Sequence, residues 1–284
     1  MSAVLNAASA ALGQPVRSAA RVSGGDVAEA FRLQLDDGQV VFAKTRAGAA
    51  PDFFDTEARG LRWLRAADAL PVPDVLFVSS DPPLLVLEWI DESHRRPVSD
   101  VEFGRALAAL HGAGAPCFGR EDCRPTGSRG LPNDPCTTWA EFFGERRLLP
   151  LARLASDEGA LPATTVAMLE TIASRLGEFE ASDEAPARLH GDLWAGNRLV
   201  DASGQSWLID PAAHGGHREF DLAMMQLFGG WADDAFAAYD EAAPLAPGWQ
   251  ERIGLHQLAP LAVHAIKFGG GYVGATAETA RRYC

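Results

Sequence analysis

The segment 189–211 constrains the fold more than any other part of the chain, because it combines strand-forming runs with chemically active side chains. The apolar runs 198–200 and 207–209 have the composition of strands. The residues between them, 201–205, are polar or glycine and are typical of a turn. We therefore expect a short β-hairpin in the second half of the chain.

Two candidate metal ligands stand at the open end of this predicted hairpin. In an antiparallel pair, residues that face each other have a constant index sum. A turn centred between Ser203 and Gly204 gives a sum of 407, which sets Asn197 opposite Asp210. An amide oxygen and a carboxylate at that separation suit Mg²⁺, which prefers hard oxygen ligands.

A third side chain, Asp192, precedes Asn197 by five residues on the loop that enters the hairpin. Protein kinases use the same order for phosphoryl transfer: a loop Asp as base, an Asn five residues later, and a later Asp for the metal. Here His-Gly-Asp (190–192) replaces His-Arg-Asp, and Asp-Pro-Ala (210–212) replaces Asp-Phe-Gly. The pattern therefore resembles kinase-like enzymes that phosphorylate small molecules.

The N-terminal part contains residues suited to nucleotide phosphates. Gly24 and Gly25 lie in a predicted turn between strands, where glycine lets backbone N–H groups approach phosphate oxygens. Lys44 follows on an apolar strand one hairpin later. In the predicted helix 55–67, Glu57 falls on the apolar stripe and therefore needs a buried cation as partner. We expect that partner to be Lys44.

A continuous apolar strand ends at Glu88, Trp89 and Ile90, after which the sequence turns polar. This change predicts a domain boundary, with a nucleotide-binding lobe at 1–90 and a catalytic, acceptor-binding lobe at 91–284. In a kinase-like fold the segment would be the hinge whose backbone meets adenine. The alternative is a central strand that contacts no ligand.

The second part is mostly helical in pattern. The loop-rich stretch 115–138 is a candidate for part of an acceptor pocket. The helix 220–228 is apolar all round, so Asp221 within it should be buried and should hydrogen-bond the backbone of the Asp192 loop. His214 and His217, together with Asp210 and Asp221, form a less favoured alternative metal set.

Composition excludes some classes of function. The net charge is −13, with 25 basic against 38 acidic residues, which argues against nucleic acid and an anionic membrane as partners. No apolar stretch is long enough to span a membrane, and the N-terminus lacks a basic signal-peptide region, so we expect a cytoplasmic protein. The cysteines lack metal-site spacing and are expected to be free thiols: Cys117, Cys123, Cys136 and Cys284.

Nearly the whole chain resembles the fructosamine kinases, also called ketosamine 3-kinases. The segments that carry the resemblance are 24–32, 190–197, 208–212, 218–224, 227–230 and 268–272. The resemblance implies an α+β, bilobal protein-kinase-like fold. It would have a small N-terminal lobe, built from an antiparallel sheet and one key helix, and a mostly helical C-terminal lobe.

The same resemblance implies an ATP- and Mg²⁺-dependent kinase that phosphorylates a sugar hydroxyl of a ketoamine. Asp192 would be the base, and Asn197 and Asp210 would bind the metal. Lys44 would hold the phosphates and would be positioned by Glu57. All five residues are present, which speaks against a catalytically inactive nucleotide-binding scaffold.

Other readings stay open from sequence alone. An aminoglycoside or choline-type kinase would share the Asp192 loop. Trp194 on that loop either faces the sugar or packs internally. Some family members carry a Cys in the glycine loop where this chain has Asp26, so a thiol switch is not implied. The oligomeric state and the identity of the ketoamine are not specified.

Overall fold

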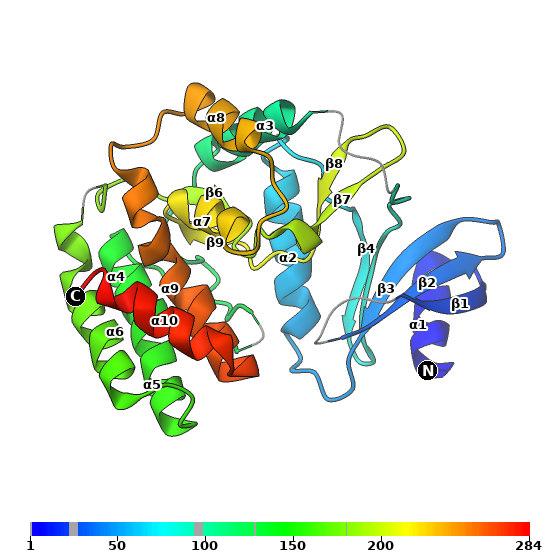
Figure 1. The fold of residues 1–284 in the computed structure, drawn as a ribbon. Helices are drawn as coiled ribbons and strands as arrows, with labels where there is room; N and C mark the ends of the chain where they lie inside the picture. Colours follow the sequence, from blue (N-terminus) through cyan, green and yellow to red (C-terminus); the bar gives the residue numbers. More distant parts are fainter. Residues whose placement is uncertain (1, 23–27, 94–98, 128, 180) are drawn as a thin grey trace. The chain divides into compact units, whose positions relative to one another are not determined.

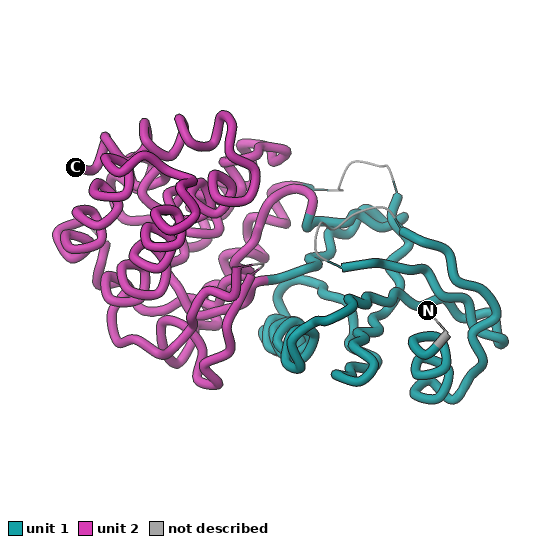
Figure 2. The backbone as a smooth tube through the Cα atoms, turned by 90° about the horizontal axis from the view of Figure 1, so that it is seen from below, with its two compact units in different colours: residues 1–99, 197–211 teal, residues 100–196, 212–284 magenta. Residues whose placement is uncertain are grey.

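The computed structural model divides the chain into two compact units, shown in two colours in Figure 2. The first unit comprises residues 1–99 and 197–211, and the second comprises residues 100–196 and 212–284. The structure describes residues 2–22, 28–93, 99–127, 129–179 and 181–284.

The first unit is built on an antiparallel sheet with five strands in its described part, in the order β1-β2-β3-β5-β4 (Figure 1). The strands are β1 (Val16–Val22), β2 (Glu29–Leu35), β3 (Val40–Thr45), β4 (Val75–Ser80) and β5 (Pro83–Glu88). Two helices pack on it, α1 (Ser2–Leu12) and α2 (Phe53–Arg65). The predicted order of strands and helix is therefore present.

One face of this sheet packs against α1. Ala8 of the helix is buried together with alternate residues of β2, β3 and β5, as the two-residue periodicity of strands requires. These strand residues are Phe31, Leu33, Leu35, Val41, Ala43, Leu84 and Val86. They form an apolar core between the helix and the sheet.

The other face of the sheet meets α2. Lys44 stands directly opposite Leu85 in the β3–β5 register, so both side chains lie on the same face. Because Lys44 contacts Glu57 of α2, this face is the one that α2 covers. The buried residues of α2 recur at helical spacing: Phe54, Ala58, Leu61 and Leu64.

The hairpin of β7 (Arg198–Val200) and β8 (Ser206–Leu208) belongs to the first unit, although it lies late in the sequence. The backbone N–H of Ser93 donates to the carbonyl of Val200 at 2.7 Å, and that of Leu208 donates to Pro71 at 2.9 Å. The boundary expected from the sequence lies at residue 90 and leaves the hairpin in the second lobe. In the structure these two hydrogen bonds tie the hairpin to segments beside the sheet.

Helices make up most of the second unit (Figure 1). A short two-stranded sheet, β6 (Ala187–Leu189) with β9 (His214–Gly216), lies among them. The main α-helices are α3 (Asp100–Gly112), α4 (Trp139–Phe143), α5 (Leu149–Asp157), α6 (Ala163–Arg175), α7 (Glu219–Phe228), α8 (Asp233–Ala242), α9 (Trp249–Phe268) and α10 (Gly271–Arg281). A π-helical stretch, Gly144–Leu148, joins α4 to α5.

The long helix α9 supports both α7 and α10. Its buried residues include Leu255, Leu258 and Ala262, which lie on one stripe and join the core of the unit. Two glycines separate α9 from α10. Gly269 and Gly270 have positive φ angles of 63° and 58°, and α10 begins at Gly271.

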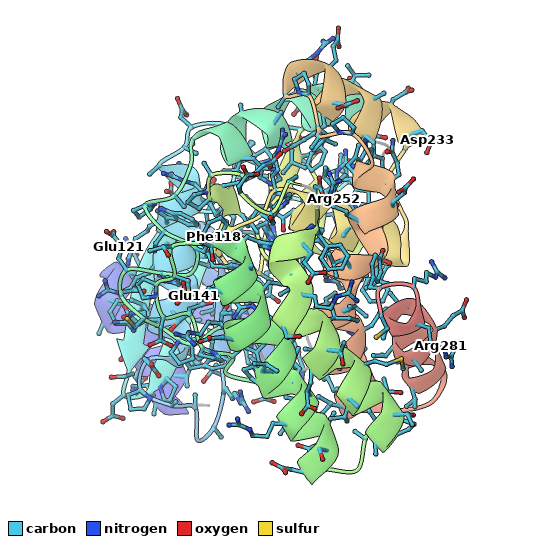
Figure 3. All side chains as sticks on the ribbon, turned by 90° about the vertical axis from the view of Figure 1, so that its left-hand side faces the viewer. Phe118, Glu121, Glu141, Asp233, Arg252 and Arg281 are labelled. Carbon is cyan, nitrogen blue, oxygen red and sulfur yellow. The ribbon has the colours of Figure 1, made fainter. Side chains whose placement is uncertain are left out.

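Within the described residues, no helix is both long and apolar enough to cross a lipid bilayer. All four cysteines are free thiols, as expected from their spacing. Phe118, in the loop-rich stretch before α4, is buried, whereas Glu121 is exposed (Figure 3).

The close contact of α3 with α8 leads to a stability prediction. A Cβ at Gly104 would collide with the carbonyl oxygen of Ala235, so Gly104→Ala should lower the free energy of unfolding by about 2 kcal/mol. Gly112→Ala is the matched control on the same helix, because nothing lies within 4 Å of its Cβ position. It should change stability by less than about 1 kcal/mol. Urea unfolding measures both, and equal effects would contradict the contact.

Candidate active site

Lys44 is the centre of a charged cluster in the first unit. Its Nζ lies 2.8 Å from Oε1 of Glu57 and 2.7 Å from Oδ1 of Asp210. The two carboxylates are 13 and 166 residues away in the sequence. The contact with Glu57 is the one expected from helix periodicity. The contact with Asp210 brings the expected metal ligand to the expected phosphate-binding lysine.

The two carboxylates keep Lys44 in its charged form. The Lys44 and Glu57 side chains are only 14% and 12% exposed, whereas that of Asp210 is 47% exposed. Burial by itself lowers the pKa of Lys44, but the charges and hydrogen bonds of Glu57 and Asp210 outweigh it and raise the pKa. Lys44 is therefore a cation fixed in position on the sheet.

The register of the β7–β8 hairpin differs by one residue from the sequence prediction. Arg198 pairs with Leu208, so the index sum is 406 and not 407. The side chain of Asp201 explains the difference, because its Oδ1 accepts the backbone N–H groups of Ser203 and Gln205 at 2.9 and 3.1 Å. These bonds close a turn centred on Ser203, which the composition of the turn did not specify.

As a result Asn197 faces Ile209 and not Asp210. The N–H of Ile209 donates to the carbonyl of Asn197 at 3.0 Å. The two expected metal ligands still lie at the same end of the hairpin, since Nδ2 of Asn197 is 3.5 Å from the carbonyl oxygen of Asp210. Asp210 has a left-handed φ of 55°, which is uncommon for a residue with a side chain.

In the second unit, Asp221 holds the backbone of the loop that carries Asp192. Its fully buried carboxylate accepts the N–H of His190 at 2.7 Å and that of Gly191 at 2.9 Å. Burial raises the pKa of Asp221, but hydrogen bonds from His111 and the loop outweigh it and lower the pKa. The Asp221 carboxylate therefore stays ionised and accepts two hydrogen bonds. The sequence analysis predicted this contact with the backbone of the Asp192 loop.

Gly191 provides the turn from β6 into this loop. Its φ is 81°, and a Cβ there would collide with the carbonyl oxygen of Ala212. Asp192 follows directly, is half-buried, and donates its backbone N–H to Nδ1 of His190 at 3.3 Å. The chain is thus anchored on the residue before Asp192, which restricts where its carboxylate can lie.

Trp194, two residues after Asp192, is 39% exposed. Its ring packs over Gly196, where any side chain would collide with the indole. It also meets the Phe228 ring edge-on, with 6.0 Å between centroids. The indole therefore rests on the loop and is not part of the core, so its contact with substrate stays a prediction.

The expected hinge residues lie at the end of β5. Glu88 donates its backbone N–H to the carbonyl of Asp74 at 2.9 Å, and its Oε2 accepts the Asp74 N–H at 3.1 Å. The indole of Trp89 donates to Asp91 at 2.7 Å, and Ile90 is buried. The N–H of Glu88 is thus bonded within the unit, and the assignment of Glu88, Trp89 and Ile90 to adenine binding stays a prediction.

The expected glycine loop lies between β1 and β2. Gly24 and Gly25 fall outside the described residues, as does Asp26. Their assignment to phosphate binding therefore stays a prediction from the sequence.

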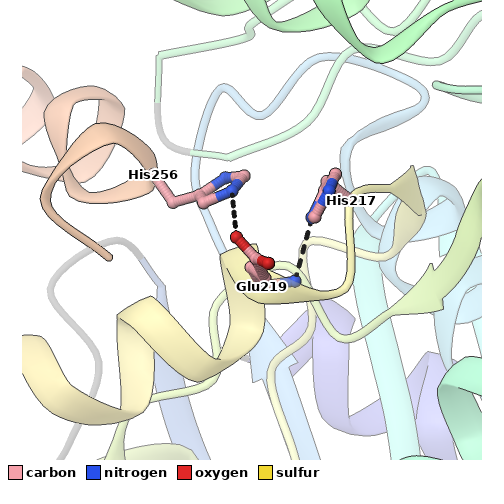
Figure 4. Close-up of side chains that lie close together, drawn as sticks. All are labelled: His217, Glu219 and His256. Carbon is pink, nitrogen blue, oxygen red and sulfur yellow. Dashed lines mark hydrogen bonds and ion pairs between the residues drawn. The ribbon is translucent and has the colours of Figure 1, made fainter. Parts of the chain in front are cut away.

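A further buried polar cluster lies at the start of α7 (Figure 4). Both carboxylate oxygens of Glu219 accept hydrogen bonds from Arg252, at 3.0 and 2.6 Å. Nε2 of His256 lies 3.4 Å from Glu219, and Nδ1 of His217 accepts the Glu219 N–H at 3.2 Å. Burial alone raises the pKa of Glu219, but His256 and Arg252 outweigh it and lower the pKa to about 2.

This cluster has the residue types of a metal site, and its candidate ligand atoms lie within 4.8 Å of one another. Its hydrogen bonds oppose that use. Both oxygens of Glu219 face the Arg252 guanidinium, and Nε2 of His217 is 2.9 Å from the carbonyl of Ala181. A divalent cation would have to break these bonds beside a fixed positive charge, so we interpret the cluster as an anchor for α7.

The alternative metal set of the sequence analysis is not assembled in the part of the chain that the structure describes. Nδ1 of His214 bonds the carbonyl of Ala212 at 2.8 Å. Asp210 is paired with Lys44, and Asp221 holds the Asp192 loop. Each expected ligand thus has another partner.

Arg252 and His256 were not anticipated from sequence. Arg252 extends from α9 into the interior of its unit and is 6% exposed (Figure 3). The available signal was Glu219, an acidic residue that opens an apolar, buried helix and therefore needs a cation. That signal does not identify the cation, because Arg252 is 33 residues away in the chain.

Comparison with known proteins identifies the chain. The family model described as fructosamine kinase matches residues 1–283. The chain belongs to the fructosamine kinase family. It is therefore a phosphotransferase that acts on hydroxyl groups, and a kinase of this family uses a nucleotide.

Relatives match this kinase over most of their length. A protein named probable ketoamine kinase in Synechocystis is 35% identical, covering 92% of the chain and 88% of the relative. The chloroplastic protein-ribulosamine 3-kinase of Arabidopsis thaliana is 32% identical, covering 88% of the chain and 78% of the relative.

Solved structures establish the fold of this kinase. A protein assigned as a fructosamine-3-kinase from Thermobifida fusca has a TM-score of 0.89 and 41% identity, covering 100% of the chain and 99% of that protein. An aminoglycoside phosphotransferase shares the fold at a TM-score of 0.63 and 18% identity, covering 99% of the chain and 98% of that protein. The expected α+β, protein-kinase-like fold is thus confirmed.

Two buried histidines lead to a prediction about pH. Burial lowers the pKa of His214 to about 3 and, with the neighbouring His256, that of His217 to about 4. Between these values and the ordinary pKa of about 6.5, the unfolded chain binds protons that the folded chain does not, so acid favours unfolding. The free energy of unfolding should fall by about 2–3 kcal/mol between pH 7.5 and pH 5.5.

Urea unfolding at the two pH values measures this change. His217→Asn should weaken the pH dependence by about one proton, because one of the two groups is removed. A free energy of unfolding that stays constant between pH 7.5 and pH 5.5 would contradict the neutral, buried imidazoles.

Proposed function

We propose that the chain is an ATP- and Mg²⁺-dependent kinase that phosphorylates a sugar hydroxyl of a ketoamine. The observation that carries the proposal is the convergence of Glu57 and Asp210 on Lys44. This arrangement joins the two parts of a phosphoryl-transfer site, a lysine for phosphates and a carboxylate for the metal.

In this proposal Lys44 contacts the phosphates of ATP and Glu57 sets its position. Lys44 is held as a fixed cation on the sheet and can donate a hydrogen bond to a phosphate oxygen. The Gly24-Gly25 turn would add backbone N–H groups. The adenine would lie against the backbone of Glu88, Trp89 and Ile90 at the end of β5.

The residues present fit Mg²⁺. Asn197 offers an amide oxygen and Asp210 a carboxylate at the same end of one hairpin, and Mg²⁺ is usually held by one or two such groups together with phosphate oxygens. Bound there, Mg²⁺ would supply positive charge to the phosphates. The second oxygen of Asp210 remains for a ligand, because the bond from Lys44 is made to Oδ1.

Asp192 is the proposed base. It would accept the proton of the sugar hydroxyl, whose oxygen forms a bond to the γ-phosphorus as the bond to the leaving oxygen of ADP breaks, in line with it. The support is positional: Asp192 follows a backbone segment held by two hydrogen bonds to Asp221.

The acceptor class rests on the relatives, which are named for ketoamines and protein-bound ribulosamine. We place the sugar beside Trp194, because its exposed indole lies two residues from Asp192.

The test measures nucleotide consumption in the presence of Mg²⁺ with each of five acceptor conditions, and the products are checked by mass. The conditions are ribulosyl-lysine, fructosyl-lysine, an aminoglycoside, choline and no acceptor. Turnover with the ketoamines alone supports the proposal. Turnover with the aminoglycoside or choline alone overturns the acceptor class.

Removal of the proposed base should abolish most turnover. Asp192→Asn should lower kcat by roughly 100-fold or more and leave ATP affinity largely unchanged, since a positioned base contributes about that much. Asp234→Asn, at an exposed carboxylate in the same unit, is the control and should leave kcat unchanged. An Asp192→Asn enzyme with normal kcat would exclude Asp192 as the base.

The Lys44–Glu57 pair should matter for the nucleotide more than for folding. Glu57→Gln should weaken ATP binding about tenfold, equivalent to about 1.4 kcal/mol, because Lys44 loses a fixed partner. Asp55→Asn on the same helix is the matched control, since Asp55 forms a salt bridge with Arg59 one turn later on α2. Calorimetric titration measures both, and equal ATP affinities in the two variants would contradict the role of Glu57.

A further inference from the structure

Large apolar side chains are exposed at four described positions, and three of them lie together. Leu76, on β4, is 41% exposed and belongs to the first unit. Trp194, Phe228 and Phe268 are 39%, 38% and 53% exposed, and all three belong to the second unit. Exposed apolar groups that are clustered usually mark a binding surface, whereas isolated ones are common on any protein.

These three side chains are joined by two further rings. Phe228 lies 5.1 Å from the ring of His264, which in turn lies 5.5 Å from Phe268 and 5.0 Å from Tyr272. With the contact between Trp194 and Phe228, a continuous row of rings starts at the Asp192 loop. We call Trp194, Phe228, His264, Phe268 and Tyr272 the aromatic strip.

The helices of the second unit hold the aromatic strip in place. Phe228 is the last residue of α7, Phe268 is the last of α9, and Tyr272 is in the first turn of α10. His264 precedes Phe268 by four residues and therefore lies on the same face of α9. Because α9 packs against both α7 and α10, the rings are presented from helix ends that support one another.

The aromatic strip also has the electrostatics to bind an ammonium group. The face of an aromatic ring is electron-rich and attracts cations. Nζ of Lys267 lies 4.8 Å from the centroid of the Phe268 ring, so this ring already has a cation and the ammonium group of a ligand belongs nearer Phe228. The net charge of −13 further favours a cationic ligand.

We infer that the aromatic strip binds the amine-bearing carrier of the ketoamine, a protonated amine with an apolar alkyl or aryl extension. The inference rests on the proposed function and names the part of the substrate that lies beyond the sugar. With the hydroxyl at Asp192 and the sugar at Trp194, the amine and its extension lie next along the strip, over Phe228 and toward Phe268. A carrier with a long apolar extension is therefore preferred over a small one.

The test compares two fructose-derived ketoamines, one of methylamine and one of hexylamine. Both carry the same sugar and the same charge, so only the extension differs. The unsubstituted enzyme should show a kcat/KM about tenfold higher for the hexylamine derivative, mainly through a lower KM, because the extension buries apolar surface on the strip. Phe268→Ser should reduce that ratio to near one.

Two further variants separate this role from a general effect on folding. Phe268→Tyr keeps the ring and should restore the ratio. Leu76→Ser removes the comparably exposed side chain of the first unit and should leave kcat/KM for both acceptors unchanged.

Each other outcome has a defined meaning. An unsubstituted enzyme that phosphorylates both ketoamines equally well, or a Phe268→Ser enzyme with an unaltered ratio, overturns the inference while the proposed function stands. If Phe268→Ser leaves the ratio unaltered but abolishes self-association in sedimentation, the strip is an interface between copies of the chain. If the unsubstituted enzyme phosphorylates neither ketoamine, the proposed function fails and the inference with it.

Discussion

The charge of Lys44 is the constraint around which the first unit is organised. A lysine on an inner strand is expensive to bury, and the cost is offset only when carboxylates meet it at short range. Glu57 and Asp210 do so at 2.8 and 2.7 Å. One of these bonds fixes the rotation of α2 on the sheet, and the other fixes the end of the β7–β8 hairpin. The cation thus connects three separate parts of the chain.

In the second unit, buried carboxylates on α7 have the corresponding role. Glu219 and Asp221 are both completely buried and two residues apart, and they serve different neighbours. Glu219 accepts two hydrogen bonds from the guanidinium of Arg252, which connects α7 to α9. Asp221 accepts hydrogen bonds from two backbone N–H groups, which connects α7 to the Asp192 loop. The loop is therefore connected through one short helix to the interior of its unit.

Sequence reasoning succeeded where a residue type and its period imply a single partner. Glu57 on an apolar stripe requires a cation, and Lys44 is one of only two lysines in the chain. Asp221 in an apolar helix requires donors, and the neighbouring loop supplies them. The sequence-based prediction was wrong for the register of the β7–β8 hairpin, because the register depends on the geometry of one side chain and not on composition. The carboxylate of Asp201 moved the hairpin register by one residue, and turn propensity alone carries no such information.

Hydrogen-bond and ion-pair partners that are distant in the sequence could not be predicted either. Nothing in the local sequence around Glu219 identifies Arg252, and nothing around Ser93 identifies Val200 as its hydrogen-bond acceptor. For the same reason the extent of the first unit was underestimated. The strand and helix periodicities of its N-terminal part were sufficient to place the sheet, but they do not show that a hairpin more than 100 residues later completes it.

Because residues 197–211 belong to the first unit, no single cut in the chain separates the two units. A fragment ending at residue 99 would retain Lys44 and Glu57 but lack Asp210, together with the hairpin backbone that bonds Ser93 and Pro71. The remaining fragment would carry that hairpin without the segments to which it is bonded. Amide hydrogen exchange in the hairpin should therefore follow opening of the first unit and not of the residues on either side of it in the sequence.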